Sequence, residues 1–266
     1  MTRLDIPKLL RERGYEPLRL QDRIVSSAAR RALAVLGEQS VAALLYHMST
    51  MTGKNEKELL SNYVEFEKAL WSSLGYGADI LLKRFSDELD RIVHRSGVGL
   101  GEVLDEIRQN EPAVFARSIA QGENAALLYT STAFRDNTVS AFFEPLEGRV
   151  AMAALVERPT KLPPAVARTT YRDLQSGRGR AGIGSRVAEW TSNLRPEGSA
   201  LRLAKDNTWL VENGMSEPSH DSIGLRKAAL LCAYDLTRID SASAAKAIEL
   251  HDFVVAEGLQ GIYARG

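Results

Sequence analysis

Apolar residues recur at spacings of three and four along the first part of the chain, which is the period of an amphipathic helix. Between positions 20 and 36, one such face consists of Leu20, Ile24, Val25, Ala28, Ala32 and Val35. Gly37 ends this predicted helix, and a second predicted helix stops at Gly53. Asn55 and either Ser61 or Asn62 are of the types that cap helix N-termini, so two shorter helices should follow.

A further apolar stripe predicts a helix that ends before Gly97. Its members are Ile80, Leu81, Phe85, Leu89, Ile92 and Val93. Trp71 lies on the apolar stripe of the preceding helix, and we expect it in the core. Pro112 breaks the last helical stretch because proline lacks the amide donor. The pattern therefore predicts an all-helical domain over residues 1–121.

The pattern changes after Gly122 to short apolar runs separated by helical segments. The runs are AALLYTS, RVAMAALVE, SALRLAKDN and AALLCAY. Runs of this length are typical of strands buried on both faces of a parallel sheet. Helices are predicted over residues 185–194 and 241–250, whereas the rest of residues 160–198 is expected to be partly loop. We therefore predict a two-part α+β chain, whose second domain, residues 122–266, is α/β with a mostly parallel sheet.

Composition narrows the class of protein. The hydrophobic fraction of 44% and the charged fraction of 26% are typical of globular proteins. Because 34 basic residues balance 34 acidic ones, we expect no general attraction to nucleic acid or anionic membranes, although local basic patches remain open. A single cysteine excludes an internal disulfide bond and fits a reducing compartment. Without a secretory h-region or a run of about eighteen apolar residues, a soluble cytoplasmic protein with no membrane partner is expected.

Two parts of the chain resemble known families. Residues 34–89 are similar to an output-domain family of ammonia-oxidising archaea. The motifs that carry this resemblance are LGEQSVAALLYHM, FEKALWSSLG and GYGADILLKRF. That family is a small helical module found beside signalling domains, so the resemblance implies that the helical domain is an output module.

The second half resembles the MEDS domain, the methanogen/methylotroph sensory domain of the DcmR regulator type. The motifs are GENAALLYTS, ALRLAKDNTWLVENG and ALLCAYDLTRIDSASAAKAIELHDFVVAEG. The resemblance implies a RecA/KaiC-like α/β fold that has lost nucleotide hydrolysis and senses small organic molecules. Between Val156 and Ala200 the chain is shorter than the family. A strand–helix unit is therefore expected to be missing or degraded there, and with it part of a ligand pocket.

The sequence lacks the motif for ATP hydrolysis. A P-loop needs G-x-x-x-x-G-K-[ST] after the first strand, but TSTAFRDN follows AALLY, with neither glycine nor lysine. The segment SGRGRAGIG does contain G-x-G-x-x-G, yet what precedes it is polar and helix-like, so a dinucleotide fingerprint lacks its strand. We expect a flexible basic loop in which Arg178, Arg180 and Arg186 could bind an anion.

Cys232 and His251 have the side chains best suited to metal or sensor chemistry. Thiolate and imidazole bind zinc and iron, but such sites need three or four ligands and few others lie nearby in the sequence, so we predict no metal site. The apolar run around Cys232 favours a buried strand followed by a packed helix. In the alternative interpretation Cys232 contacts a ligand, and Asp235 and His251 face the same pocket.

Trp209 follows a predicted strand, at the edge where open α/β sheets bind ligands. Asp206 and Asn207 beside it could hydrogen-bond a small polar ligand. Core packing of Trp209 is the alternative. The sequence contains neither G-x-S-x-G nor H-E-x-x-H, and a cysteine within an apolar strand is normally inert, so we do not expect an enzyme and identify no cofactor.

The leading hypothesis is a non-enzymatic signalling or regulatory protein. A small organic ligand of the sensory domain would shift its population of conformations and reposition the helical module. One alternative is a DNA-binding transcriptional regulator that uses the N-terminal helix carrying Arg19, Arg23, Arg30 and Arg31. Another is an oligomerisation scaffold, for which self-association into a homodimer would be the measurable activity.

Overall fold

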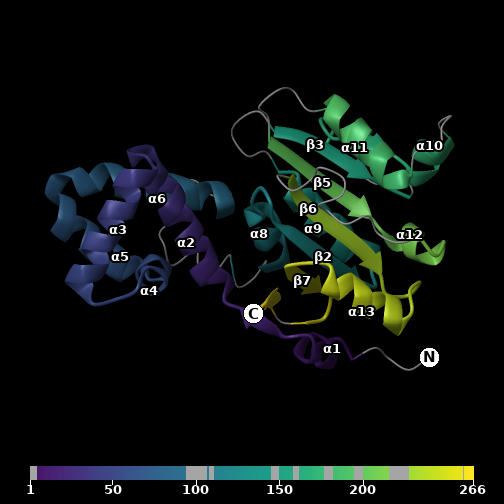
Figure 1. Cartoon of the computed structure of the whole chain (residues 1–266), viewed down its shortest axis with the longest axis horizontal. Coiled ribbons are helices and arrows are strands. Elements are labelled where there is room, and N and C mark those ends of the chain that lie inside the picture. Colours follow the sequence, from purple (N-terminus) through teal and green to yellow (C-terminus); the bar gives the residue numbers. More distant parts are fainter. Residues whose placement is uncertain are drawn as a thin grey trace. The chain divides into compact units, whose positions relative to one another are not determined.

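The computed structural model describes residues 5–93, 107, 111–144, 150–157, 162–176, 182–194, 200–215, 228–259 and 261–266. The chain divides into two compact units (Figure 1). One unit, the helical unit, is Arg19–Val114, and the other, the α/β unit, combines Met1–Leu18 with Phe115–Gly266.

The helical unit is built from short helices whose ends follow local rules. Its elements are α2 (Leu20–Leu33), η1 (Ala34–Leu36), α3 (Glu38–Thr52), α4 (Glu56–Ser61), α5 (Tyr63–Leu74), η2 (Gly75–Gly77) and α6 (Ala78–Val93). Gly53 ends α3 in the left-handed conformation, at φ +68°. Asn55 forms a capping box with Glu58, and the side chain of Asn62, not that of Ser61, caps α5.

The helical core forms where α2 packs against α4 and α6. Helix α5 joins this core through Phe66, whose ring centroid lies 5.8 Å from that of Phe85 of α6.

Three sequence expectations are wrong: Trp71 is 38% exposed, Val35 is 52% exposed and Ile80 is 67% exposed. Val35 lies in η1, after α2 has ended at Leu33. Trp71 and Ile80 lie at the border of an apolar stripe, one position from a buried leucine, and one position is about 100° around a helix. Trp71 instead meets Tyr76 edge-on.

The α/β unit contains an eight-stranded sheet of order β1-β8-β7-β2-β6-β5-β3-β4. The strands are β1 (Tyr15–Leu18), β2 (Asn124–Tyr129), β3 (Val150–Leu155), β4 (Ala167–Thr169), β5 (Ala200–Asp206), β6 (Ala228–Asp235), β7 (Phe253–Ala256) and β8 (Ile262–Arg265). From β7 to β4 all neighbours are parallel. The predicted mostly parallel sheet and its strands β2, β3, β5 and β6 are thus confirmed.

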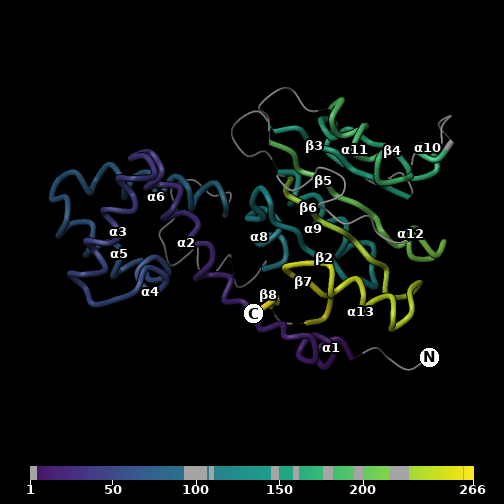
Figure 2. The backbone as a smooth tube through the Cα atoms, in the orientation of Figure 1, coloured from purple at the N-terminus to yellow at the C-terminus, as the bar shows by residue number. Residues whose placement is uncertain are grey.

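The chain's two ends form one antiparallel edge of this sheet (Figure 2). Tyr15 pairs with Arg265, and Pro17 stands in the edge strand β1, where a missing amide donor is tolerated. The expectation that residues 1–121 are all helical is therefore wrong at the start, because this short strand is stabilised by a partner distant in the sequence. The helix predicted over residues 241–250 is confirmed by α13 (Ser241–Glu249); His251 lies after its end, and β7 begins at Phe253.

Helices cover both faces of the sheet. They are α1 (Ile6–Glu12), α8 (Glu111–Ser118), α9 (Thr132–Phe142), α10 (Tyr171–Ser176), α11 (Ile183–Leu194), α12 (Thr208–Glu212) and α13 (Ser241–Glu249). Apolar residues of α1 and α10 to α13 pack on the face that carries Leu230 and Cys232. On the other face, Arg202 donates to the Ala116 carbonyl of α8 and lies over the ring of Phe142 of α9.

Strand β4 and helix α10 lie between β3 and β5, in the segment that was expected to be partly loop, and β4 pairs with β3. Among the described residues, no helix is both long and apolar enough to cross a membrane.

Candidate functional site

The carboxyl ends of the parallel strands meet at one edge of the sheet, which is where open α/β sheets bind ligands. Polar residues follow or end nearly every strand there. They are Thr130 after β2, Glu157 after β3, Asp206 and Asn207 at β5, Asp235 at β6 and Glu257 after β7. A ligand-binding site is therefore expected at this edge.

The carboxylate of Glu257 accepts hydrogen bonds from the donor groups at the start of α9. It accepts from the Thr130 amide at 2.6 Å, the Thr130 hydroxyl at 2.7 Å and the Ser131 amide at 2.8 Å, and also from the Ser131 hydroxyl. Ser131 is the N-cap of α9. Burial opposes ionisation, but these donors outweigh it and lower the pKa of Glu257 to about 2. In a P-loop, backbone amides that follow a buried strand donate hydrogen bonds to a phosphate. Here the amides of Thr130 and Ser131 donate to the carboxylate of Glu257 instead.

Beside this contact, Arg135 of α9 reaches across to β5. Its guanidinium lies 3.7 Å from the Asp206 carboxylate, donates to Asp136 at 2.7 Å and lies 5.6 Å from the centre of the Tyr129 ring. Burial raises the pKa of Asp206, against the hydrogen bonds from Thr208 and the charge of Arg135. Burial, with Asp206 adding to it, raises the pKa of Tyr129 to about 12.

The crevice at this place is almost closed. It has a volume of about 30 Å³ and includes Arg135, Asp206, Val139 and Leu162 in its lining. A single ordered water needs about 10–15 Å³, so the crevice has room for one or two waters and not for an organic ligand. Of the residues predicted to bind a ligand, Asp206 alone lines it.

A second group of ion pairs lies at the same edge of the sheet and links the segments that follow β3 and β6. Arg238, in the turn after β6, donates to Glu157 at 2.6 Å and also to Glu212 of α12 at 2.8 Å. Hydrogen bonds and charge from these two carboxylates raise the pKa of Arg238. Nearby, the Asp235 carboxylate accepts from the amide and hydroxyl of Thr237 and so shapes that turn.

Asn207 and Trp209 belong to the packed layer between the sheet and its helices. Asn207 is fully buried; its side-chain oxygen accepts from the Tyr171 hydroxyl at 2.6 Å, and its amide donates to the Tyr234 hydroxyl at 3.1 Å. Trp209 stacks on Tyr171, with ring centroids 5.5 Å apart and planes 12° from parallel. The side-chain amide of Asn207 therefore bridges two tyrosines.

Cys232 and His251 are both fully buried. Cys232 occupies the middle of β6, opposite Ala126 of β2. His251 lies in the turn between α13 and β7, where its Nδ1 is 2.7 Å from the Ala247 carbonyl and its ring meets Tyr234 edge-on. Within the described part of the chain, no group of three or more His, Cys, Asp or Glu residues could hold a metal ion.

The described arginines among those named in the sequence analysis make contacts within the chain. Arg178 and Arg180 lie outside the described residues. Arg186 donates to the carbonyls of Leu174 and Gln175 and so covers the end of α10. In α2, Arg30 pairs with Glu56 at 2.7 Å, and Arg31 is 3.9 Å from Glu88.

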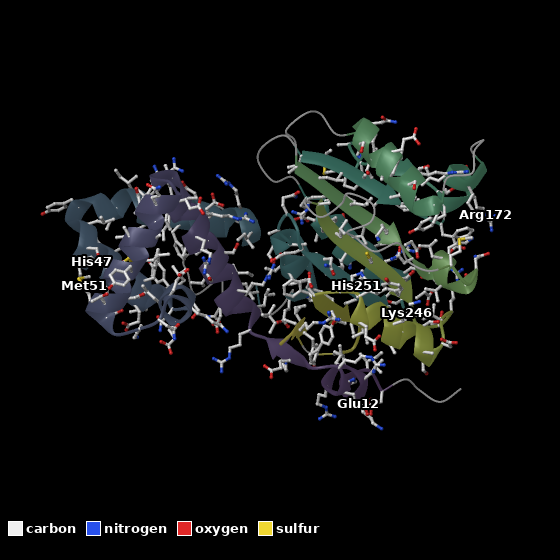
Figure 3. All side chains as sticks on the ribbon, in the orientation of Figure 1. Glu12, His47, Met51, Arg172, Lys246 and His251 are labelled. Atoms are coloured by element: carbon white, nitrogen blue, oxygen red, sulfur yellow. The ribbon has the colours of Figure 1, made fainter. Side chains whose placement is uncertain are left out.

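The structure reveals a cavity that the sequence reasoning missed, between α12 and α13. It has a volume of about 190 Å³ and is lined by Val211, Gly214, Met215, Tyr234, Ser243, Lys246, Ala247 and Leu250. Lys246 projects from α13, and His251 lies in the turn after it (Figure 3). The segment SASAAKA of α13 could have indicated this cavity, because a helix with such small side chains leaves space beside the neighbouring helix.

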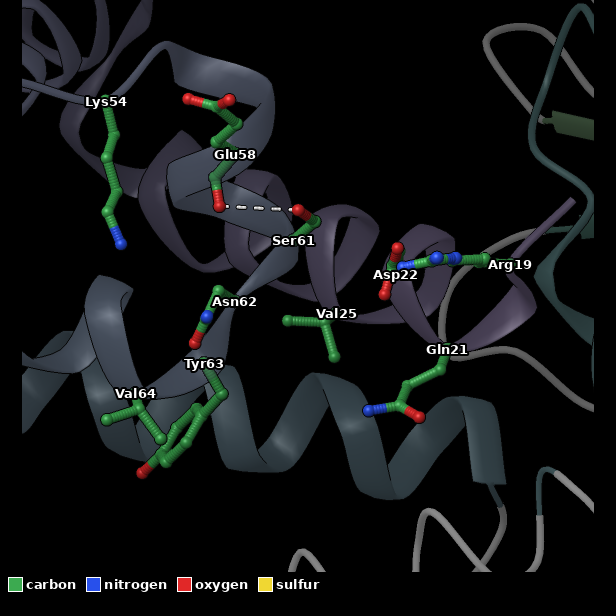
Figure 4. A pocket seen from close by; sticks show the side chains of 10 residues that line it. All are labelled: Arg19, Gln21, Asp22, Val25, Lys54, Glu58, Ser61, Asn62, Tyr63 and Val64. Atoms are coloured by element: carbon green, nitrogen blue, oxygen red, sulfur yellow. Dashed lines mark hydrogen bonds between the residues drawn. The ribbon is translucent and has the colours of Figure 1, made fainter.

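The helical unit has a wider groove between the start of α2 and the α4–α5 corner (Figure 4). Its volume is about 630 Å³, and its charged lining residues are Arg19, Asp22, Lys54 and Glu58. Because positive and negative side chains alternate, the groove offers no consistent field for an anionic polymer.

Comparison with known proteins finds no relative for this chain: no family model, no curated protein and no solved structure matches it.

Proposed function

We propose that the chain is a non-enzymatic regulatory protein, in which the α/β unit senses a small organic molecule and the helical unit carries the output. The observation that carries this proposal is the carboxylate of Glu257 on the amides of Thr130 and Ser131. An anion supplied by the chain occupies the donors that a nucleotide phosphate would need, which favours a sensory function over nucleotide hydrolysis.

The strand order supports a RecA-like assignment for the α/β unit. Its first parallel strand, β2, lies between β7 and β6, with β5 and β3 beyond. This order differs from the 3-2-1-4-5-6 and 2-1-3-4-5 orders of dinucleotide-binding and flavodoxin-like sheets. It is the order expected of a RecA-like core, and the MEDS resemblance implies the same fold.

The ligand site in this proposal is the cavity between α12 and α13. At about 190 Å³ it is smaller than the roughly 300–1,000 Å³ of drug-sized pockets, so it suits a compact organic molecule. Met215 and Leu250 supply apolar surface, and Lys246 supplies a positive charge. A small molecule with an apolar body and a polar or anionic end fits this lining.

A chain of hydrogen bonds connects the cavity to the core. Tyr234 lines the cavity, and its hydroxyl accepts from Asn207, which in turn accepts from Tyr171. A ligand that favours one packing of Tyr234 therefore acts on α10 and α12 together, and so shifts the population of conformations of the unit.

A thermal-shift screen tests the proposal. The panel contains short-chain carboxylates, alcohols and amines, with nucleotides and divalent metals for comparison. A small organic ligand should raise Tm of the wild type and of Ala242→Phe, whose position on α13 is exposed outside the cavity. It should not raise Tm of Ser243→Phe, in which the ring fills the cavity. A panel in which ATP stabilises the chain and no organic compound does would overturn the proposal.

One observation favours the oligomerisation alternative as a second property. Among the residues that the structure describes, exposed large apolar side chains lie in the helical unit, with the exception of Leu250.

A further inference from the structure

Helix α3 has an outward face without charge. From Gln39 to Thr52 the chain contains no Asp, Glu, Lys or Arg. Helix α6 of the same unit shows the usual contrast, because its exposed positions include Lys83, Arg84 and Asp87. An exposed helix normally carries charged or polar side chains opposite its apolar stripe. The exposed face of α3 carries only uncharged polar groups, a histidine, two alanines and a tyrosine, so it lacks the charges that would keep two such faces apart.

The buried side of α3 is narrow. Leu45 and Met48 are the fully buried residues of this helix. The opposite face consists of Gln39, Ala42, Ala43, Tyr46, His47 and Thr50, all exposed. Tyr46 is 77% exposed and is the large side chain on this face; Met51, at 44% exposed, lies at its flank. His47 and Met51 appear on this helix in Figure 3.

We propose that this face of α3 pairs with the same face of a second copy of the chain, antiparallel and across a twofold axis. The axis passes between positions 43 and 46. A twofold interface brings identical patches together, so residue i meets residue j and j meets i. Tyr46 then packs over Ala43 of the other copy, and Gln39 meets Thr50.

Two features single out a second copy as the occupant. The first is shape: a bulky ring and a small residue stand one helical turn apart on one face, so each ring finds a hollow when the helix is paired with itself reversed. The second is charge: two identical faces that carried charge would repel each other, whereas this face is uncharged and the whole chain has a formal net charge of zero.

The small area of the proposed α3–α3 interface limits the affinity of the dimer. Fifteen residues of α3 span about 22 Å, and a contact of one helix per copy falls at the low end of specific interfaces, below about 800 Å² per partner. The dimer is therefore expected to dissociate on dilution. The inference concerns the helical unit and does not depend on a ligand of the α/β unit.

Sedimentation velocity of the full chain over a concentration series tests the pairing. The wild type should show a dimer that dissociates on dilution. Tyr46→Glu and Ala43→Glu should each weaken self-association at least about tenfold, while circular dichroism and Tm stay near wild type because both positions are exposed. Tyr46→Phe keeps the ring and should keep the dimer. Leu250→Glu, an exposed apolar position of the α/β unit, should keep it too.

A charge pair tests the register. Tyr46→Lys alone should be monomeric, as should Ala43→Glu alone. Mixed together they should form a heterodimer, because lysine at 46 of one copy then meets glutamate at 43 of the other. A wild type that stays monomeric at every concentration would overturn the proposal, as would a dimer that Tyr46→Glu leaves intact. Failure of the mixture to associate would overturn the antiparallel pairing.

Discussion

Replacing Glu257 with glutamine removes the charge from the anion that joins the end of β7 to the start of α9. Glutamine keeps one acceptor oxygen but turns its NH₂ toward groups that also donate, so at least one of the four hydrogen bonds is lost. The fold needs this contact because Thr130 and Ser131 would otherwise leave amide donors at a helix start without their partner.

The size of the effect follows from the pKa. A carboxylate whose pKa is lowered from the ordinary 4.5 to about 2 contributes roughly 3 kcal/mol to the free energy of unfolding at neutral pH. Because Glu257 is only partly buried, solvent screening reduces this free energy, and we expect about 1–2 kcal/mol. For a chain of this size that is a fall in Tm of about 2–8 °C.

The stabilisation by Glu257 depends on pH in a direction that its pKa determines. The folded-state pKa of Glu257 lies below its unfolded value, so its stabilising effect is present above about pH 4.5 and is lost as the pH falls toward 2. Scanning calorimetry of wild type and Glu257→Gln should therefore show a Tm gap at pH 7 that narrows as the solution is acidified. Glu189→Gln, on the exposed side of α11, is the control and should match wild type throughout. Equal Tm values for wild type and Glu257→Gln at pH 7 would show that this carboxylate does not stabilise the fold. A Tm gap that does not narrow on acidification would show that its charge is not the cause.

Three further substitutions or probes test the packed layers. Asn207→Ala leaves the hydroxyls of two buried tyrosines without this partner and should cost about 2–4 kcal/mol in urea denaturation; an effect below about 0.5 kcal/mol would contradict the bridge. Tyr15→Phe removes hydroxyl bonds to the carbonyls of Ile248 and His251 and should lower stability by about 1–3 kcal/mol, whereas Tyr76→Phe, at a position 90% exposed, should change little. Cys232 should react with a thiol reagent at the rate of unfolding, and fast labelling of the native chain would show that its strand is not buried.

The central strands could be predicted because each is apolar on both faces. AALLY and AALLCAY leave no polar position that a solvent-facing strand would need, and both became buried strands. The edge strands could not be predicted in this way. β1 and β8 have four residues each and pair across almost the whole chain, so their stability comes from contacts that no local window contains.

The site was harder to predict for the same reason. Glu257 bonds to Thr130, which lies 127 positions away, and nothing near either residue signals the pair. The residue types expected near a ligand were reasonable, yet Asn207 is used for internal hydrogen bonding and Cys232 for packing. The cavity between α12 and α13 depends on how two helices lie against the sheet, which side-chain periodicity does not determine.

Isothermal titration calorimetry measures whether the cavity between α12 and α13 binds a ligand. The compound that most raises Tm in the screen is titrated into wild type, Ser243→Phe and Ala242→Phe. We expect one site per chain in wild type and Ala242→Phe, with a negative heat-capacity change from burial of apolar surface, and no measurable heat of binding in Ser243→Phe. Binding of equal affinity to all three proteins would contradict a sensory site between α12 and α13.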